Sequence, residues 1–119
     1  MKTLTELEQL KPCPDGLAWA RQQPSLYDAW ENCERSDWMW WLLRKLNKIP
    51  KALSVQYAQG CASHVKQLNN WYAAAYTDDI AAAYASYAAY IAAAYATDSI
   101  AERKWQANFL RTLTPNPFL

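Results

Sequence analysis

Three cysteines and one histidine are the residues of this 119-residue chain whose side chains could do chemistry together: Cys13, Cys33, Cys61 and His64. They make a complete ligand set for zinc, and Cys61 and His64, spaced i, i+3, would share one face of a helix. However, no two cysteines have the Cys-x2-4-Cys spacing typical of structural zinc sites. A buried free cysteine also behaves as a small apolar residue. A zinc-stabilised helical module is therefore the alternative to a fold that binds no metal.

Catalytic patterns are weak in this sequence. Cys61 and His64 could form a nucleophile pair, but neighbours on one helix rarely supply the third group that orients the base. Asp78 and Asp79 are adjacent, so their side chains diverge on a helix, and a helix cap is the favoured interpretation. The chain has no phosphate-binding glycine loop, no GxSxG motif and no HExxH motif. We therefore expect a protein that is not an enzyme and needs no cofactor.

We expect the rest of the chain to be arranged around the segment from Ser25 to Leu46, because this segment contains four of the seven tryptophans. Ser25 and Asp28 predict a capping box at the start of one helix, and Ser36 predicts the cap of the next. On a helical wheel Trp40 falls opposite the main apolar face, with Arg44 one turn further on and Trp41 on the flank.

Two interpretations of these tryptophans are open. Either every one is core in a helix packed on two sides, or Trp40 or Trp41 is partly exposed beside Arg44. Tryptophan and arginine are enriched in binding hot spots, so the second interpretation predicts a partner-binding site. Arg35 lies at the junction of the two helices, where it forms a structural ion pair or cap with Asp37 or else reaches a partner.

An alanine- and tyrosine-rich tract covers residues 72–96 and contains an imperfect eleven-residue repeat, AYTDDIAAAYA followed by SYAAYIAAAYA. Eleven residues make almost three helical turns, so equivalent positions form one stripe. The stripe consists of Tyr76, Ile80, Tyr84, Tyr87, Ile91 and Tyr95. We expect it to pack against the tryptophan helices, and the alternative is an exposed row of rings that accepts a protein or a single-stranded base. Tyr72 and Tyr90 lie outside the stripe.

The sequence also predicts helices in the remaining segments. Residues 3–10 and 17–22 predict short helices, residues 50–70 predict a longer one with Gly60 at a close helix contact, and Ser99 with Glu102 predicts the cap of the last. The sequence therefore predicts an all-α, antiparallel bundle of six or seven helices. We expect one domain over residues 1–119, with short helices in 1–23, the tryptophan and Cys/His helices in 24–70, and the alanine-rich and final helices in 71–114.

The net charge, the lengths of the apolar runs and the number of cysteines restrict the possible functions. The net charge is +1, so no direct binding of nucleic acid is expected,. No apolar run approaches the length of a membrane span, and the first residues carry acids where a signal peptide would be apolar. The odd number of cysteines indicates reduced thiols, as in a cytoplasmic protein.

The order of the motifs resembles a known group. A CPDG turn is followed by SLYDAWENCERSDWMWWLL, ALSVQYAQGCASHV, the alanine-rich tract and ERKWQANFLR. This order resembles the predicted all-α immunity proteins of bacterial polymorphic toxin systems and related uncharacterised prophage and gut-phage proteins. The resemblance covers most of the chain and is carried by Cys13, Gly16, Trp30, Cys33, Arg35, Asp37, Trp38, Trp41, Leu42, Cys61, Ala62 and residues 102–111.

That resemblance implies a small protein that binds and blocks another protein in a bacterium or a phage. The target would be a toxin or a host defence complex such as a CRISPR effector, which would make the chain an immunity or anti-CRISPR protein. The candidate partner-binding residues are Trp40, Trp41, Arg44, Arg35 and Tyr90. The alanine-rich tract is also suited to packing against a second copy in a homodimer.

Overall fold

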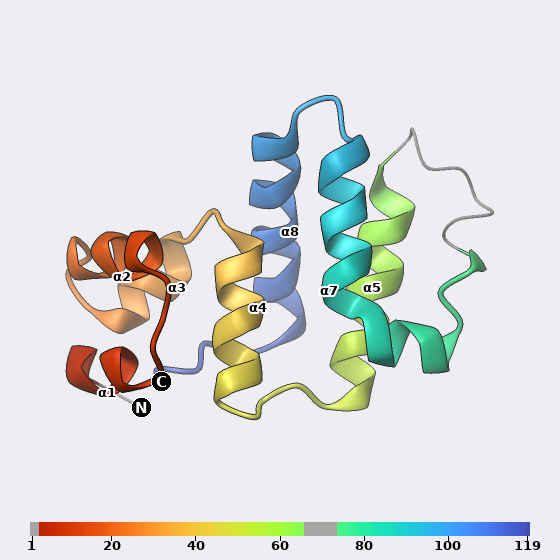
Figure 1. Ribbon diagram of the computed structural model, residues 1–119. Coiled ribbons are helices and arrows are strands. Elements are labelled where there is room, and N and C mark those ends of the chain that lie inside the picture. The colour runs from red at the N-terminus through yellow and green to blue at the C-terminus, as the bar shows by residue number, and fades with distance from the viewer. Residues whose placement is uncertain (1–2, 66–73) are drawn as a thin grey trace.

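The computed structural model describes residues 3–65 and 74–119, and these ranges contain helices and no strands (Figure 1). The seven helices in them are α1 (Leu4–Gln9), α2 (Pro14–Arg21), α3 (Leu26–Asn32), α4 (Ser36–Lys45), α5 (Lys51–His64), α7 (Asp78–Tyr95) and α8 (Ser99–Leu113). The prediction of an all-α fold is confirmed, and the described ranges alone contain seven helices. In the described ranges, no helix is both long enough and apolar enough to span a membrane.

Four helices, α4, α5, α7 and α8, form the bundle, and the short helices α1, α2 and α3 lie together beside α4 (Figure 1). α4 and α5 run in opposite directions, as do α7 and α8, while α5 and α7 run in the same direction (Figure 1). The ion pair between Lys51 and Asp79 (3.2 Å) joins the starts of these two parallel helices. The helix expected over residues 50–70 ends at His64. Leu68 and Tyr72, which the sequence placed in helices, lie outside the described residues.

Several helix ends follow from local chemistry. The hydroxyl of Ser25 accepts a hydrogen bond from a backbone amide in the first turn of α3, as predicted, and that of Thr3 does the same for α1,. Asn47 ends α4 in the left-handed conformation (φ 55°), which asparagine tolerates well,. The last cap differs from the prediction, because Asp98 and not Ser99 caps α8.

One face of α7 is made of alanine, and this face packs mainly against α5. Its buried members are Ala81, Ala85, Ala88, Ala89, Ala92 and Ala93. Small side chains let two helix backbones approach closely, and alanine loses no rotamer freedom on burial. The expectation that the tyrosine stripe packs inward is therefore wrong for α7. Of its tyrosines only Tyr76, which precedes the helix, is buried.

Gly60 on α5 lies where a larger residue would not fit. A Cβ atom there would collide with the ring of Phe109 on α8, which explains the glycine and confirms the predicted close helix contact. Next to it, Tyr57 stacks on Trp40 with ring centroids 4.7 Å apart and on Phe109 at 6.3 Å. This stack of rings is the centre of the core.

The C-terminal part of the chain holds the short helices in place. The guanidinium of Arg111 donates to the backbone carbonyls of Trp30 (2.7 Å) and Cys33 (2.9 Å) at the end of α3. The side-chain amide of Asn116 donates to the carbonyl of Tyr27 (3.1 Å). The bonds from Arg111 satisfy carbonyls at the end of α3 that would otherwise lack partners. Together with the bond from Asn116 they attach α3 to α8 and the tail.

The close α5–α7 contact predicts different costs for the same substitution at two positions of α7. Ala92→Leu inserts three carbon atoms into a fully buried contact and should lower the free energy of unfolding by about 1–3 kcal/mol,. Ala94→Leu, on the exposed side, should change it by less than about 0.5 kcal/mol,. Urea unfolding followed by circular dichroism measures both, and equal costs would contradict the described contact.

Candidate functional site

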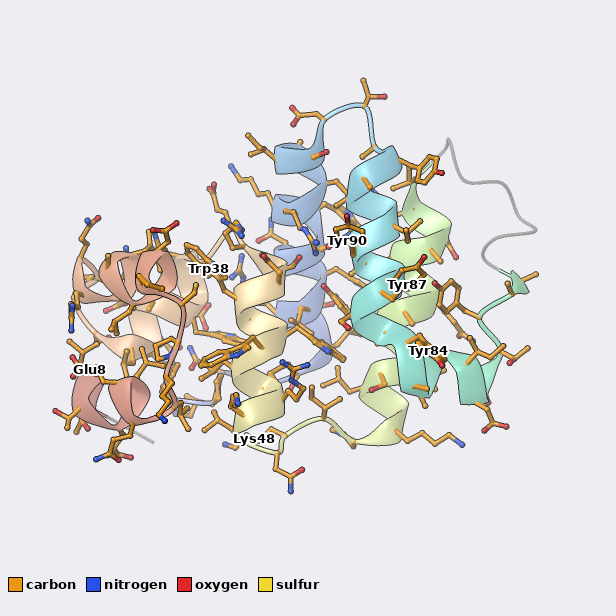
Figure 2. The ribbon with its side chains drawn as sticks, viewed as in Figure 1. Glu8, Trp38, Lys48, Tyr84, Tyr87 and Tyr90 are labelled. Atoms are coloured by element: carbon orange, nitrogen blue, oxygen red, sulfur yellow. The ribbon has the colours of Figure 1, made fainter. Side chains whose placement is uncertain are left out.

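The outer side of α7 carries an exposed aromatic surface, which we call the tyrosine face: Tyr84, Tyr87, Tyr90 and Tyr95. Their exposed fractions are 58%, 55%, 58% and 59%. Figure 2 shows Tyr84, Tyr87 and Tyr90 following one another along the helix. The spacing produces this surface, because the alanines take the inward positions and leave the outward ones to tyrosine.

The tyrosine face carries no charge of its own. No acidic or basic residue occurs between Asp79 and Asp98, so all of α7 beyond its first turn is uncharged. The helix bends at Tyr84, whose φ of −124° and ψ of 30° leave the helical region. An exposed helix side is usually rich in Lys and Glu, whereas the centre of a protein–protein interface is depleted in charge and enriched in tyrosine. The composition of the tyrosine face is that of an interface centre.

Beside the tyrosine face lies a cavity of about 310 Å³ between α4, α7 and α8, which we call the α4–α7 hollow. Its walls include Trp40, Trp41, Arg44 and Tyr90, so four of the five predicted partner-binding residues meet here. Tyr90 belongs to both the hollow and the tyrosine face. Arg35, the fifth, lies outside the hollow.

Trp40 does not occupy the exposed position considered for it. It is 8% exposed and stacks nearly parallel on Tyr57, with an angle of 13° between the rings. The helical wheel placed Trp40 opposite the main apolar face correctly, but α4 is packed on that side as well. Trp40 is therefore a core residue whose edge reaches the wall of the hollow, while Trp41 is half-buried and Arg44 is exposed.

The sequence suggested a contact of Arg44 with Trp40 or Trp41, but the structure has cation–ring contacts at other pairs of residues. Arg35 lies 4.4 Å from the ring centroid of Trp38, and Lys45 lies 5.9 Å from that of Trp41. Arg35 also holds Asp37 through two hydrogen bonds, of 2.9 and 2.7 Å. Burial raises the pKa of the Asp37 carboxyl, but these bonds and the charge of Arg35 outweigh it and leave the pKa below its ordinary value,. The structural interpretation of Arg35 is the one that the geometry supports.

A buried polar network lies beneath the hollow. Ser36, which the sequence suggested as a helix cap, is buried and its hydroxyl donates to Gln106 Oε1 (2.8 Å). Arg103 donates to both groups at 3.1 Å, and the amide of Gln106 donates to the carbonyl of Ala89 (3.0 Å). This network joins α4, α7 and α8 and fixes the guanidinium of Arg103 in the wall of the hollow. Sequence reasoning missed Gln106, and its only signal was a polar residue within the apolar pattern of the last helix.

His64 pairs with a buried carboxylate. Its Nδ1 lies 2.8 Å from Glu102 Oε2, and its ring stacks on Trp105 with centroids 3.5 Å apart. Glu102 is 6% exposed, and burial raises its pKa above the ordinary value although the hydrogen bond and charge of His64 act in the opposite direction. The neighbouring Cys61 is fully buried, and burial, together with the charge of Glu102, raises the pKa of its thiol. A buried protonated thiol is a poor nucleophile, so this geometry does not favour the Cys61–His64 pair.

The four residues suggested as zinc ligands do not come together in the structure. Cys13 is exposed just before α2, Cys33 is buried at the end of α3, and Cys61 lies inside the bundle; all three thiols are free. In residues 3–65 and 74–119, no three His, Cys, Asp or Glu side chains come close enough together to hold a metal ion.

Comparison of the chain with protein-family models, with curated proteins and with solved structures finds no match. The resemblance to immunity and phage proteins therefore stays a prediction, and the function is argued from the geometry.

The positions of Trp40 and Arg44 predict opposite results on stability. Trp40→Ala removes a buried, stacked indole and should lower the free energy of unfolding by about 3–5 kcal/mol. Arg44→Ala, on the exposed rim of the hollow, should change it by less than about 0.5 kcal/mol. Thermal and urea unfolding of the two variants provide the measurement. A Trp40→Ala protein as stable as the unaltered chain would place this ring outside the core.

The raised pKa of Glu102 predicts a pH dependence. A raised folded-state pKa contributes stability that is fully present below the unfolded-state value of about 4.3 and is lost as the pH rises through the folded-state pKa. Glu102→Gln cannot ionise, so the unaltered protein should lose free energy of unfolding relative to this variant between about pH 4 and pH 7. Urea unfolding across that range tests the prediction, which fails if the difference is constant or has the opposite sign.

Proposed function

We propose that this chain is a small, non-enzymatic inhibitor that binds and blocks another protein through the tyrosine face. The observation that carries the proposal is the exposure of more than half of each tyrosine in the set Tyr84, Tyr87, Tyr90 and Tyr95, on a helix that carries no charge beyond its first turn. The alanines of the opposite face do the packing, so the fold does not require these rings. Large exposed apolar patches on soluble proteins mark interaction sites.

The tyrosine face has the energetic properties of a contact surface. A tyrosine ring brings a large contact area with only two rotatable bonds, so its immobilisation costs little conformational entropy. The rings stand on one helix anchored by α5, so their backbones need little rearrangement on binding. The phenol hydroxyls add hydrogen bonds at the edges of the contact.

The hollow adds charge at one edge of this surface. Arg44 and Arg103 both line it, while the third charged residue in its wall, Asp37, is neutralised by Arg35. The hollow is therefore net positive and suits an acidic side chain of the partner. Charge complementarity of this kind at the rim increases the rate of association and the specificity more than the affinity.

We place the action in the cytoplasm, where the three free thiols stay reduced,. The target class follows from the sequence resemblance and is a bacterial toxin or a defence effector complex such as a CRISPR effector. Stoichiometric binding and not catalysis is the mode of action that the buried Cys61 and the partnered His64 favour.

The test is capture of a partner by the tagged chain from bacterial lysates containing candidate toxins and defence complexes, followed by measurement of the dissociation constant. Alanine at Tyr84, Tyr87 and Tyr90 together should weaken binding by at least about 30-fold, which corresponds to about 2 kcal/mol. The matched control is Tyr27→Ala, which removes a 42%-exposed tyrosine of α3 and should leave binding unchanged.

Circular dichroism establishes that both variants are folded. The captured protein should also lose its activity at a ratio of one to one with the unaltered chain. Equal binding by the triple variant and the unaltered chain would rule out the tyrosine face as the contact. If the triple substitution changes only the self-association of the chain, the tyrosine face is the contact of a homodimer instead.

A further inference from the structure

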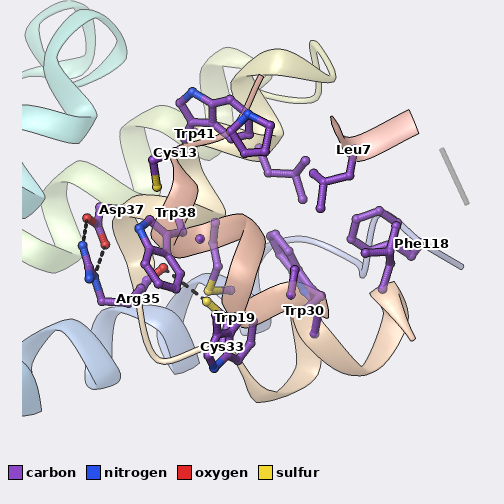
Figure 3. Close-up of a pocket in the computed structure, with 17 residues that line it drawn as sticks. Leu7, Cys13, Trp19, Trp30, Cys33, Arg35, Asp37, Trp38, Trp41 and Phe118 are labelled. Carbon is purple, nitrogen blue, oxygen red and sulfur yellow. Dashed lines mark hydrogen bonds and ion pairs between the residues drawn. The ribbon is translucent and has the colours of Figure 1, made fainter. Parts of the chain in front are cut away.

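A second cavity, of about 420 Å³, lies between the short N-terminal helices and α4 and is separate from the tyrosine face (Figure 3). We call it the N-terminal cavity. Aromatic side chains make much of its wall: Trp19, Trp30, Trp38, Trp41 and Phe118. Trp19 and Trp38 form a tilted pair with centroids 6.1 Å apart and an interplanar angle of 50°. Rings that meet at such an angle form a concave apolar surface.

The two charged groups in this wall are already paired with each other. Arg35 and Asp37 hold each other through two hydrogen bonds, shown as dashed lines in Figure 3. The thiol of Cys33 donates to the carbonyl of Arg35 at 3.5 Å, and burial raises its pKa, so it stays uncharged. A charged ligand would find no unpaired counter-charge here and would lose its hydration on entry. The wall therefore selects for an uncharged molecule.

The width of the cavity is fixed from outside it. Arg111 and Asn116 hold α3 to α8 and the tail by hydrogen bonds to backbone carbonyls, and they do not line the cavity. These bonds hold α3, which supplies part of the cavity wall, in place relative to α8 and the tail. A ligand of matching shape would gain dispersion contacts with the ring walls.

We propose that the N-terminal cavity binds a small, uncharged aromatic molecule of about two fused rings. Natural ligand pockets have volumes of roughly 300–1,000 Å³ and are mostly apolar with a few placed polar groups. A cavity of about 150 Å³ accommodates benzene, so this larger one has room for more than a single ring. Indole rings and the thioether of Met39 in the wall favour a flat aromatic partner over an aliphatic one,. This inference does not depend on the protein-binding function of α7.

The probe is 1-naphthol, with 1-naphthoate as a matched anionic control. Saturating 1-naphthol should raise the midpoint of thermal unfolding by about 3 °C or more, whereas 1-naphthoate should leave it unchanged. Cys13 provides an independent readout, because it lines the cavity and is exposed, while the other two cysteines are buried. Bound 1-naphthol should slow its reaction with N-ethylmaleimide, measured by mass spectrometry.

Filling the cavity should abolish these effects. Ala20→Phe places a ring inside it, and Cys13→Leu, assayed by calorimetry and thermal unfolding, serves as a second filling variant if the first unfolds. Ala94→Phe, on the exposed side of α7, is the control that should retain 1-naphthol binding.

Three results would overturn the proposal. They are an unchanged midpoint with 1-naphthol, an equal shift with 1-naphthoate, and binding that persists in both filling variants. If 1-naphthol fails to bind and Ala20→Phe instead prevents capture of the protein partner, the cavity receives an aromatic side chain of that partner and not a small ligand. Loss of partner binding in the tyrosine variant alone would leave this proposal unaffected.

Discussion

The structure depends on the close packing of α7 against α5. Six alanines of α7 are buried in the bundle, and only side chains as small as alanine allow two backbones to approach closely enough,. Gly60 on α5 allows a separate close contact with α8, where the ring of Phe109 leaves no room for a Cβ atom. Once the inward positions of α7 must be small, the large residues of the same repeat have only the outward positions left. The tyrosine face is thus a direct consequence of how the core is packed.

This dependence explains what could be predicted from the sequence. The helical type of the fold follows from periodicity and capping, and the eleven-residue repeat puts the exposed Tyr84, Tyr87 and Tyr95 in one stripe, although it left Tyr90 outside. Periodicity cannot say which side faces inward, because the alanine and tyrosine stripes are equally regular. The result depends on the contact of α7 with α5, which no local pattern in the α7 sequence reveals. Trp40 shows the same limit, since its burial comes from Tyr57, seventeen residues away in sequence. The contact between Ser36 and Gln106, seventy residues apart, has no local signal at all.

The two proposed binding surfaces lie on different parts of the molecule and share two residues. Asp37 and Trp41 line both the α4–α7 hollow and the N-terminal cavity. The bundle gives the tyrosine face its rigidity through the network of Gln106 and Arg103, whereas the N-terminal helices are attached by Arg111 and Asn116. A protein target and a small aromatic ligand could therefore occupy the chain together.

Hydroxyl-radical footprinting of the individual tyrosines tests the central claim most directly, because it measures side-chain exposure in solution. The account predicts that Tyr84, Tyr87, Tyr90 and Tyr95 are oxidised rapidly in the free chain while Tyr57 is protected, in line with exposed fractions of 55–59% against 0%. With the captured target bound, the four should become protected as well. Protection of these four tyrosines in the monomeric free chain would show that α7 faces the other way. Rapid oxidation of Tyr57 would show that its ring is not in the core. Either result would contradict the account.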